Sequence, residues 1–437
     1  MINGNIFAES LDNTELNSIV ESAKSYYESN KHQKNMIEFA QWIIQELDIK
    51  MYNTNLFFLN NNRYISDNKL LLKRITQIQK LTKAQDNELV YQLTKLSDEI
   101  NATLKDLPIL LKNGAIIDGE YTSIKDIPFT PFYLDIEYNQ NAYDENVDKF
   151  LNSITCDSSK ENPIPRNELR QTLEEILGHI LLTNKFPAHV FFLSGSGENG
   201  KSTFLEMINN FVGELGQNLS LDAFNDGTSV ATLNGKLVNC SDETDDIFID
   251  KCKGYKSLAS GNTITVRPIY SQPVKIQNTA TLILSANKMP EFKDKSKGFF
   301  RRLMIIPFDF KITEKISDMD YLLSTDNAKS YILNLALKGV QSIKENGYKM
   351  SKNKYLDEQI NEYMLETDTV SSYLENENPK IENRRTADVH KEYVLYCLDI
   401  GKKSLGLANF SSRLKDFGFV SKPVYINGKT VRVYKKN

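Results

Sequence analysis

The chain has 437 residues, of which 40 % are hydrophobic and 25 % are charged, and its formal net charge at pH 7 is −4. This length predicts two to four domains, and this composition excludes a largely disordered or collagen-like protein. The sequence contains no apolar run long enough to cross a bilayer and no secretory signal pattern after Met1, so we expect a cytoplasmic protein that does not associate with membranes.

Metal-binding residues are sparse, whereas basic residues gather at one end. The four cysteines and four histidines lack the spacing of a zinc clip, a redox site or a histidine-rich metal site. Residues 401–437 contain nine basic residues and one acidic residue. This local surplus of positive charge predicts a surface that faces nucleic-acid phosphates.

The first part of the chain predicts short mixed elements. Apolar residues recur at helical spacing between Met36 and Leu47, which indicates an amphipathic helix with Trp42 in the core. Two hairpins are predicted further on, because asparagine-containing turns separate apolar runs at 56–65 and at 109–117. None of these segments carries a catalytic pattern.

Residues 133–137 read Tyr-Leu-Asp-Ile-Glu and predict a further short strand. Its acids, Asp135 and Glu137, would share one face, and paired carboxylates of this kind can hold metal ions in a primase or polymerase. A metal-dependent nucleotidyl transferase needs further carboxylates in similar strand settings, and the flanking sequence offers mostly polar loop residues. We therefore favour a structural role for this segment.

A phosphate-binding loop is the clearest pattern in the sequence. Helical spacing at 169–181 is followed by the apolar run 189–193, which is typical of a central strand buried on both faces of a parallel sheet. Residues 195–202 then read Gly-Ser-Gly-Glu-Asn-Gly-Lys-Ser and lead into a helical stretch, which is the context that a phosphate loop requires. The residues expected to bind the nucleotide are Gly195, Ser196, Gly197, Glu198, Asn199, Gly200, Lys201, Ser202 and Thr203.

The roles of these residues follow from phosphate chemistry. Glycines let backbone N–H groups approach phosphate oxygens, and the helix N-terminus adds a favourable dipole. We expect Lys201 to reach the β- and γ-phosphates of ATP and Ser202 to bind Mg²⁺.

Two later strands predict the remaining polar groups of a hydrolytic site. The strand at 237–241 leads into Asp242 and Glu243. We expect Asp242 to hold Mg²⁺ and Glu243 to polarise the attacking water. The strand at 281–285 leads to Asn287, whose amide could hydrogen-bond the attacking water or the γ-phosphate.

Arg301 and Arg302 directly precede another predicted strand, at 303–307. An arginine in this position can project across a subunit boundary and neutralise charge in the transition state of a neighbouring site. The active unit would then be a ring.

In this order, the phosphate loop, the acidic pair, Asn287 and the arginine pair resemble the superfamily 3 helicases, specifically the phage and plasmid primase–helicase C-terminal family related to poxvirus helicases. The resemblance is strong over residues 185–310, extends more weakly to the helical domain upstream, and includes no evident primase domain. It implies an AAA+ homo-hexamer that hydrolyses ATP with Mg²⁺ and in which Arg302, or Arg301, completes the site of the next subunit.

The resemblance also implies contacts with single-stranded DNA in a central channel. Segment 263–276 resembles a hairpin that projects into this channel, where phosphate pairing and base stacking would grip the strand. The residues implied are Arg267, Tyr270 and Lys275. An ordinary charged hairpin is the alternative.

The C-terminal part follows a polar linker predicted at 375–379. Two helices and a two-stranded ribbon with an Asn-Gly turn are then expected, and this order resembles the winged-helix domain found at the end of the same family. A winged helix that contacts only proteins is the alternative. The residues expected to contact duplex DNA are Arg413 and Lys415 on a recognition helix, and Lys422, Lys429 and Arg432 on the wing.

We therefore predict an α/β fold in three parts: a mixed, largely helical domain (1–182), an AAA+ P-loop ATPase core with a parallel sheet (183–345), and a linker with a winged-helix domain (346–437). The function expected is that of an ATP-dependent DNA helicase of a phage, plasmid or genomic island, which acts in the cytoplasm of a bacterial host on origin DNA and with other replication proteins. Two alternatives are an ATP-switched origin-binding protein that does not translocate and a P-loop kinase unrelated to DNA.

Overall fold

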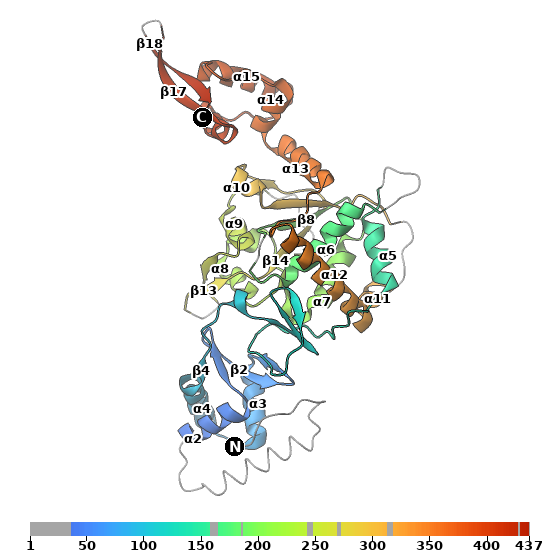
Figure 1. The fold of residues 1–437 in the computed structure, drawn as a ribbon. Helices are drawn as coiled ribbons and strands as arrows, with labels where there is room; N and C mark the ends of the chain where they lie inside the picture. Colours follow the sequence, from blue (N-terminus) through green and yellow to red (C-terminus); the bar gives the residue numbers. More distant parts are fainter. Residues whose placement is uncertain are drawn as a thin grey trace. The chain divides into compact units, whose positions relative to one another are not determined.

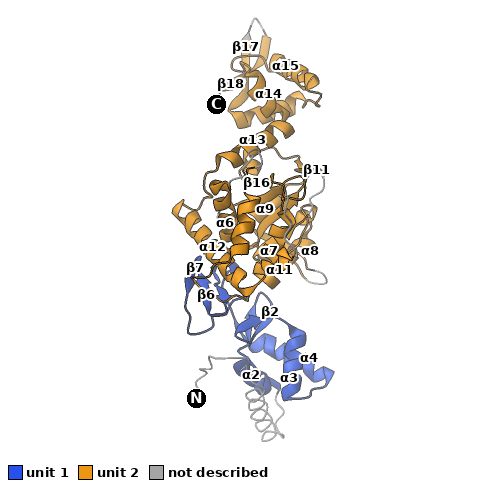
Figure 2. Ribbon diagram, turned by 90° about the vertical axis from the view of Figure 1, so that its right-hand side faces the viewer, with its two compact units in different colours: residues 1–133 blue, residues 134–437 orange. Residues whose placement is uncertain are grey.

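A computed structural model describes residues 36–157, 165–184, 187–242, 248–268, 272–312, 318–426 and 429–436 (Figure 1). The chain divides into two compact units, residues 1–133 and 134–437, and each is described by itself (Figure 2). The three domain ranges expected from the sequence remain predictions.

The first unit contains two small sheets. A four-stranded sheet has the strand order β3-β2-β1-β4, and an antiparallel three-stranded sheet has the order β5-β6-β7. The helices are α2 (Met36–Glu46), α3 (Asn68–Ile78) and α4 (Lys83–Leu96), and the strands are β1 (Lys50–Tyr52), β2 (Asn55–Asn60), β3 (Arg63–Ile65), β4 (Asp98–Glu99), β5 (Ile109–Leu111), β6 (Gly114–Ile117) and β7 (Glu120–Thr122).

The predicted helix and both predicted hairpins of this unit are confirmed. Helix α2 packs against α4 and buries Phe39 and Ile43, while Trp42 is half-buried and stacks on Phe39 with ring centroids 6.1 Å apart. Between β2 and β3, Asn61 and Asn62 have positive φ angles. Asparagine tolerates this conformation better than most residues.

The strand predicted at 133–137 is wrong. Only its first residue makes a bridge, which is an isolated one. Leu134 and Ile136 are buried, whereas Asp135 and Glu137 are exposed. Beyond the bridge from Tyr133 to Leu110 of β5, the alternating pattern reflects two buried side chains in a segment that pairs with no strand.

A five-stranded parallel sheet forms the centre of the second unit, with the order β16-β8-β14-β10-β9. Strand β8 has neighbours on both sides, and Phe191 and Phe192, which point to opposite faces, are both fully buried. The predicted central strand is therefore confirmed. The strands are β8 (Val190–Ser194), β9 (Gly216–Gln217), β10 (Val238–Ser241), β14 (Thr281–Ala286) and β16 (Leu303–Pro307).

Helices and short hairpins cover this sheet. Phe192 belongs to a large apolar cluster with Tyr255 of α9 and with Val266 and Ile276 of the β12–β13 hairpin, and α7 packs against β10 and β14. The elements are α5 (Glu145–Ile154), α6 (Asn167–Leu181), α7 (Lys201–Val212), α8 (Gly227–Val230), α9 (Lys253–Ala259), α10 (Lys297–Phe300), α11 (Met319–Leu322), α12 (Asp326–Glu345), β11 (Phe248–Ile249), β12 (Thr263–Val266), β13 (Val274–Gln277) and β15 (Glu291–Phe292).

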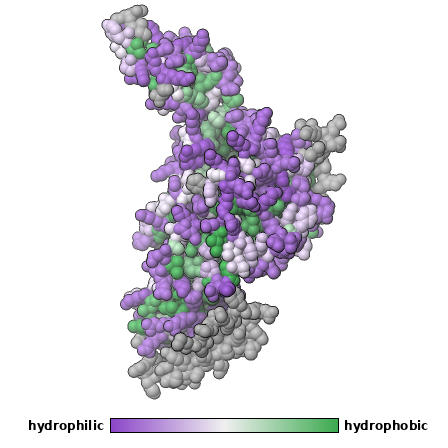
Figure 3. Space-filling view, in the orientation of Figure 1, coloured by the Kyte–Doolittle hydropathy of each residue, from purple (hydrophilic) through white to green (hydrophobic). Residues whose placement is uncertain are grey.

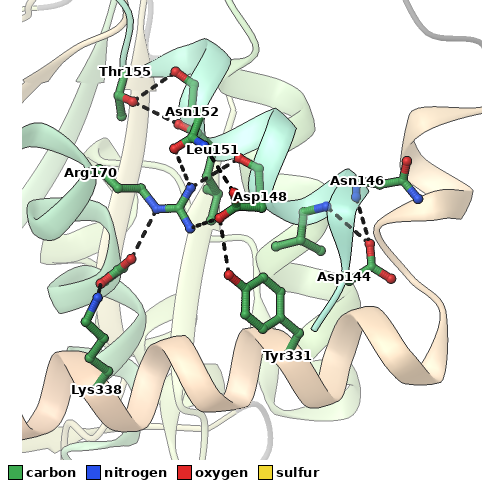
Figure 4. A network of polar contacts seen from close by, with 11 residues as sticks. Asp144, Asn146, Asp148, Leu151, Asn152, Thr155, Arg170, Tyr331 and Lys338 are labelled. Atoms are coloured by element: carbon green, nitrogen blue, oxygen red, sulfur yellow. Dashed lines mark hydrogen bonds and ion pairs between the residues drawn. The ribbon is translucent and has the colours of Figure 1, made fainter. Parts of the chain in front are cut away.

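Polar contacts join α5, α6 and α12 (Figure 4). Arg170 lies 3.0 Å from Asp148 and 3.2 Å from Glu174. From α12, Tyr331 donates to Asp148 at 3.2 Å and the ammonium of Lys338 lies 2.8 Å from Glu174. Because a buried carboxylate such as Glu174 is costly without partners, these contacts favour one fixed packing of α12 against α6.

Four helices and a two-stranded ribbon complete the second unit. Helix α13 packs against β16, and α14 follows it directly. The predicted linker at 375–379 is wrong in its first half, because residues 375–377 belong to α14. The elements are α13 (Lys354–Thr367), α14 (Thr369–Glu377), α15 (Thr386–Asp399), α16 (Leu407–Leu414), β17 (Phe419–Ile426) and β18 (Lys429–Lys436).

A short segment before α15 pairs with the ribbon as a third extended segment. The Asn383 N–H donates to the carbonyl oxygen of Tyr434 at 2.8 Å, and the Tyr434 N–H donates to that of Arg384 at 3.0 Å. The segment thus lies beside β18, on the edge opposite β17.

No helix within the described ranges is long and apolar enough to cross a membrane. The face drawn in Figure 3 is mostly hydrophilic, and its apolar residues occur in small groups. The four cysteines are buried and form no disulfide.

Candidate functional site

The phosphate loop connects β8 to α7, as the sequence predicts. Strand β8 ends at Ser194 and α7 begins at Lys201. Gly197 and Gly200 have φ angles of 104° and 83°, which glycine adopts at little cost. Helix N-termini carry N–H groups that have no helical partner. The start of α7 therefore provides an anion-binding environment next to the loop.

Close packing at Gly195 fixes the loop to the segment after β16. A Cβ atom on Gly195 would lie 2.2 Å from the carbonyl oxygen of Phe308, which leaves room for glycine alone. The buried Asn199 side chain donates to this same oxygen. The carbonyl group of Phe308 thus packs closely against Gly195 and accepts a hydrogen bond from Asn199, so it contacts the loop at two points.

Lys201 is only 5 % exposed and bonds to its own loop. Its ammonium donates to the carbonyl oxygen of Gly195 at 2.6 Å and to Oδ1 of Asn199 at 3.1 Å. A buried ammonium requires such acceptors. A phosphate oxygen would be a stronger, charged acceptor in the same place.

A cavity of about 160 Å³ lies beside the loop. Glu198 and Lys311 form an ion pair of 3.1 Å at its wall. Pockets that enclose a whole small ligand usually measure roughly 300–1,000 Å³, so this cavity is the size of part of a nucleotide. Its lining residues are Ser196, Gly197, Glu198, Asn199, Asp309 and Lys311.

Asp242 and Asn287 follow strands whose ends meet at the edge of the sheet that bears the loop. Strand β14 lies between β8 and β10, and its register pairs Ala286 with Ser194. Asn287 comes directly after β14, Asp242 directly after β10, and both are exposed. The carboxyl ends of parallel strands are the usual place for a ligand in an open α/β sheet.

The residues expected to bind Mg²⁺ fit that ion chemically. Ser202, in the first turn of α7, and Asp242 are exposed, and a hydroxyl and a carboxylate are oxygen ligands that suit Mg²⁺ together with phosphate oxygens. Thr203 is half-buried beside Ser202. Glu243 lies outside the described residues. Within those residues, no group of three or more His, Cys, Asp or Glu side chains could hold a metal ion.

The two arginines before β16 have different surroundings. Arg301 is exposed. Arg302 is half-buried, and it donates from Nε to the Ser260 hydroxyl at 2.9 Å and from Nη1 to the carbonyl oxygen of Gly298. Burial, and then the charge of Arg301, lower the pKa of Arg302. Arg301 is therefore the more accessible of the two.

The hairpin expected at 263–276 is present as β12 and β13. Arg267 and Lys275 are exposed on it, whereas Val266 and Ile276 are buried in the core. Tyr270 lies outside the described residues. The described part of the hairpin thus carries two of the three expected DNA-contacting side chains at its surface.

Arg413 lies in a buried ion-pair network, whereas the sequence predicts it on a DNA-contacting surface. Its side chain is 9 % exposed and lies 2.6 Å from Asp368, which is 3 % exposed, and 2.6 Å from Asp416. Its guanidinium also covers the ring of Phe417. These contacts join α16 to the start of α14. Lys415 is exposed, but in a short 3₁₀ turn after α16 rather than on the helix.

The remaining basic residues lie on the ribbon. Lys422, Lys429 and Arg432 are all exposed, and Arg432 donates to the Ser421 hydroxyl at 3.4 Å. Tyr425, which the sequence analysis did not select, is 74 % exposed near the described end of β17. The sequence alone does not predict this exposure, because Tyr425 stands between apolar residues. Which face of the strand it lies on follows only from the register of β17 and β18.

Three further polar residues beside the loop also escape prediction. Asp309 lines the cavity, Arg166 precedes α6 and Tyr355 lies in the first turn of α13. Each is an isolated residue in its own segment, and no spacing rule connects them. The packing of α13 against β16 brings Tyr355 to Asp309, and the Arg166 side chain reaches the same carboxylate from the start of α6.

Sequence comparisons match parts of this chain. A family of unknown function (DUF5906) matches residues 193–302. The "Putative helicase L207/L206" of Acanthamoeba polyphaga mimivirus is 25 % identical over 190 residues, which cover 40 % of this chain and 18 % of the viral protein. The chain thus matches less than a fifth of that relative's length.

Structure comparisons match nearly the whole chain. An A-form apo structure of the NrS-1 C-terminal region has a TM-score of 0.50 at 14 % identity, and it covers 93 % of this chain and 100 % of that one. A second apo structure of the same region has a TM-score of 0.49 at 13 % identity, with the same coverage. At this identity the likeness concerns the fold, a mixed α/β architecture around a parallel sheet.

Proposed function

We propose that this chain is the motor of an ATP-dependent DNA helicase that acts in the replication of a phage, plasmid or genomic island. One observation carries the proposal: the phosphate loop, Asn287 and Asp242 follow three adjacent parallel strands and share one edge of the sheet. The match of 190 residues to a viral protein named as a putative helicase supports a helicase over a kinase.

The proposed chemistry uses Lys201, Ser202, Asp242 and Asn287 of this edge together with Glu243, which follows Asp242 in the sequence. Lys201 binds the β- and γ-phosphates, and Ser202 and Asp242 hold Mg²⁺, which when bound neutralises phosphate charge. Asn287 orients the attacking water, and Glu243 accepts its proton. Both the loop and its lysine are prearranged, because Gly195, Asn199 and Phe308 fix the loop before ATP arrives.

We assign the arginine pair to a shared site in a homo-hexameric AAA+ ring. An arginine that enters a neighbouring site must be free to leave its own chain. Arg301 is exposed, whereas Arg302 bonds to Ser260 and Gly298 of its own subunit. These contacts favour Arg301 as the residue that neutralises transition-state charge in the site of the neighbouring subunit. Arg302 would hold the backbone of this segment in place.

Two surfaces are assigned to DNA. Arg267 and Lys275, with Tyr270 between them in the sequence, would contact a single strand in the central channel. The order α14, paired segment, α15, α16 and ribbon supports a winged-helix domain for duplex origin DNA. Its contacts would come from Lys415, Lys422, Lys429 and Arg432, and not from the buried Arg413.

Strand displacement from a forked DNA tests this function. The wild type should release the strand only with ATP and Mg²⁺, and Lys201→Ala and Arg301→Ala should each abolish release. Mixing the two inactive variants should restore part of the ATP hydrolysis, because a mixed ring contains interfaces with both residues intact. ATP-dependent DNA binding without any displacement would instead indicate a static switch, and small-molecule phosphorylation without a DNA effect would indicate a kinase.

A further inference from the structure

A carboxylate beside the phosphate loop holds two residues from distant parts of the chain. The Tyr355 hydroxyl donates to Oδ2 of Asp309 at 2.6 Å, and both terminal nitrogens of Arg166 lie 3.4 Å from the same oxygen. Asp309 also lines the cavity next to Ser196 and Gly197. One carboxylate thus joins the nucleotide-binding edge to α13.

The guanidinium of Arg166 makes three contacts, of which the one with Asp309 is the longest ion pair. It lies over the ring of Tyr355 at 4.0 Å from the centroid, and it also pairs with Asp157 at 3.1 Å. Its two contacts with Asp309, at 3.4 Å, are longer than a strong charge-assisted hydrogen bond. A better anionic acceptor nearby could therefore displace Asp309.

We propose that Asp309, Arg166 and Tyr355 form a latch that opens when a nucleoside triphosphate occupies the phosphate loop. The inference rests on the proposed function, since it requires nucleotide binding at this loop. Phosphates in the cavity would repel the Asp309 carboxylate and attract the Arg166 guanidinium, whose planar fork suits phosphate as well as carboxylate. Arg166 then exchanges Asp309 for a phosphate oxygen.

Helix α13 connects the latch to the C-terminal helices. Tyr355 lies in its first turn, and the hydroxyl of Tyr363 anchors its middle to the carbonyl oxygen of Pro290 at 2.6 Å. The helix ends next to Asp368, which caps α14 and binds Arg413. Figure 1 shows α13 leading from the sheet to the C-terminal helices. A change at Tyr355 therefore reaches the DNA-binding domain through one continuous helix.

The phenol remains a donor at neutral pH. Burial, and then the hydrogen bond to Asp309, raise the pKa of Tyr355 to about 12. The Tyr355 hydroxyl therefore keeps its proton and can donate to Asp309 at neutral pH.

Hydrogen–deuterium exchange of α13 tests the latch. Adding the slowly hydrolysed analogue ATPγS with Mg²⁺ to the full chain should change amide exchange in Lys354–Thr367 by roughly fivefold or more. Tyr355→Phe removes the donor to Asp309 and should abolish this response while ATPγS still binds. Asp309→Asn removes the repelling charge, so it should bind ATPγS more tightly and lose the response as well.

Tyr331→Phe is the matched control, because it removes another tyrosine hydroxyl that donates to an aspartate, Asp148, in the same unit. This variant should keep the full response in α13. An equal response in Tyr355→Phe and the wild type, or no response in a wild type that binds ATPγS, would overturn the latch and leave nucleotide binding intact. A wild type that does not bind ATPγS in calorimetry would overturn the proposed function itself.

Discussion

The ammonium of Lys201 donates to the carbonyl oxygen of Gly195, at the other end of the same loop, at 2.6 Å. The lysine is thus held in a phosphate-ready position by an acceptor that a phosphate can replace. Lys201→Ala should reduce ATP turnover by at least about 100-fold, in the range seen when one preorganised donor is lost. Lys236, which donates to the carbonyl oxygen of Glu214 at 2.6 Å, provides the matched control.

Steady-state hydrolysis and calorimetric ATP titration measure both variants. Lys236→Ala should hydrolyse ATP like the wild type, since its carbonyl contact lies away from the loop. Equal losses in the two variants would show that the Lys201 effect is a general disturbance of the fold.

Gly195→Ala should damage both the fold and the site. The added Cβ would lie 2.1 Å from Nδ2 of Asn199 and 2.2 Å from the carbonyl oxygen of Phe308, so the loop must move away from β16. We expect a lower melting temperature and loss of ATP binding. Gly213→Ala is the control, because its backbone conformation, with φ 54° and ψ −124°, costs alanine about 1–3 kcal/mol of strain but its Cβ meets no atom within 4 Å. Normal ATP binding by Gly195→Ala would contradict this packing.

Local patterns in the sequence were sufficient for much of the fold. The glycines and Lys201 of the loop, the apolar strand β8 and the asparagine turns of the first unit each depend on neighbouring residues, and the sequence predicts all of them in place. The turn predicted at Asn427 and Gly428 lies outside the described residues. The 133–137 segment failed because alternating burial does not require a partner strand. Its outward acids, Asp135 and Glu137, are exposed.

The rest of the site depends on contacts between segments that are far apart in the chain. Arg413 resembles a DNA-binding residue in the sequence because its main partner, Asp368, lies 45 residues away. Only its second partner, Asp416, is near it in the sequence. Asp309 and Tyr355 are separated by 46 residues, and only the packing of α13 on β16 joins them. Such pairings follow from topology, which single-sequence spacing does not contain.

Arg413→Met should destabilise the C-terminal helices. Removing one partner of a buried ion pair leaves Asp368 charged and poorly solvated, which costs about 3–5 kcal/mol. Urea unfolding monitored by tyrosine fluorescence measures the change. Arg432→Met makes the same substitution at an exposed position and should alter the free energy of unfolding by less than about 0.5 kcal/mol. Equal effects would refute the structural role assigned to Arg413.

The ribbon cations should determine the salt dependence of duplex binding. If Lys422, Lys429 and Arg432 each neutralise one phosphate, replacing all three by alanine should make the negative slope of log K against log salt shallower by roughly 2.7. Fluorescence anisotropy over a range of salt concentrations gives this slope. Alanine at Lys149 and Lys354, which are exposed and paired with carboxylates on their own helices, should leave it unchanged. An unaltered slope in the ribbon variant would place the duplex elsewhere.

The rate of ATP hydrolysis with and without a single-stranded oligonucleotide tests the central claim most directly. If the loop drives movement along DNA, wild-type turnover should rise when the oligonucleotide is added, and Lys201→Ala should remain at least about 100-fold slower in both conditions. A wild type that hydrolyses ATP at the same rate with and without DNA would contradict the account.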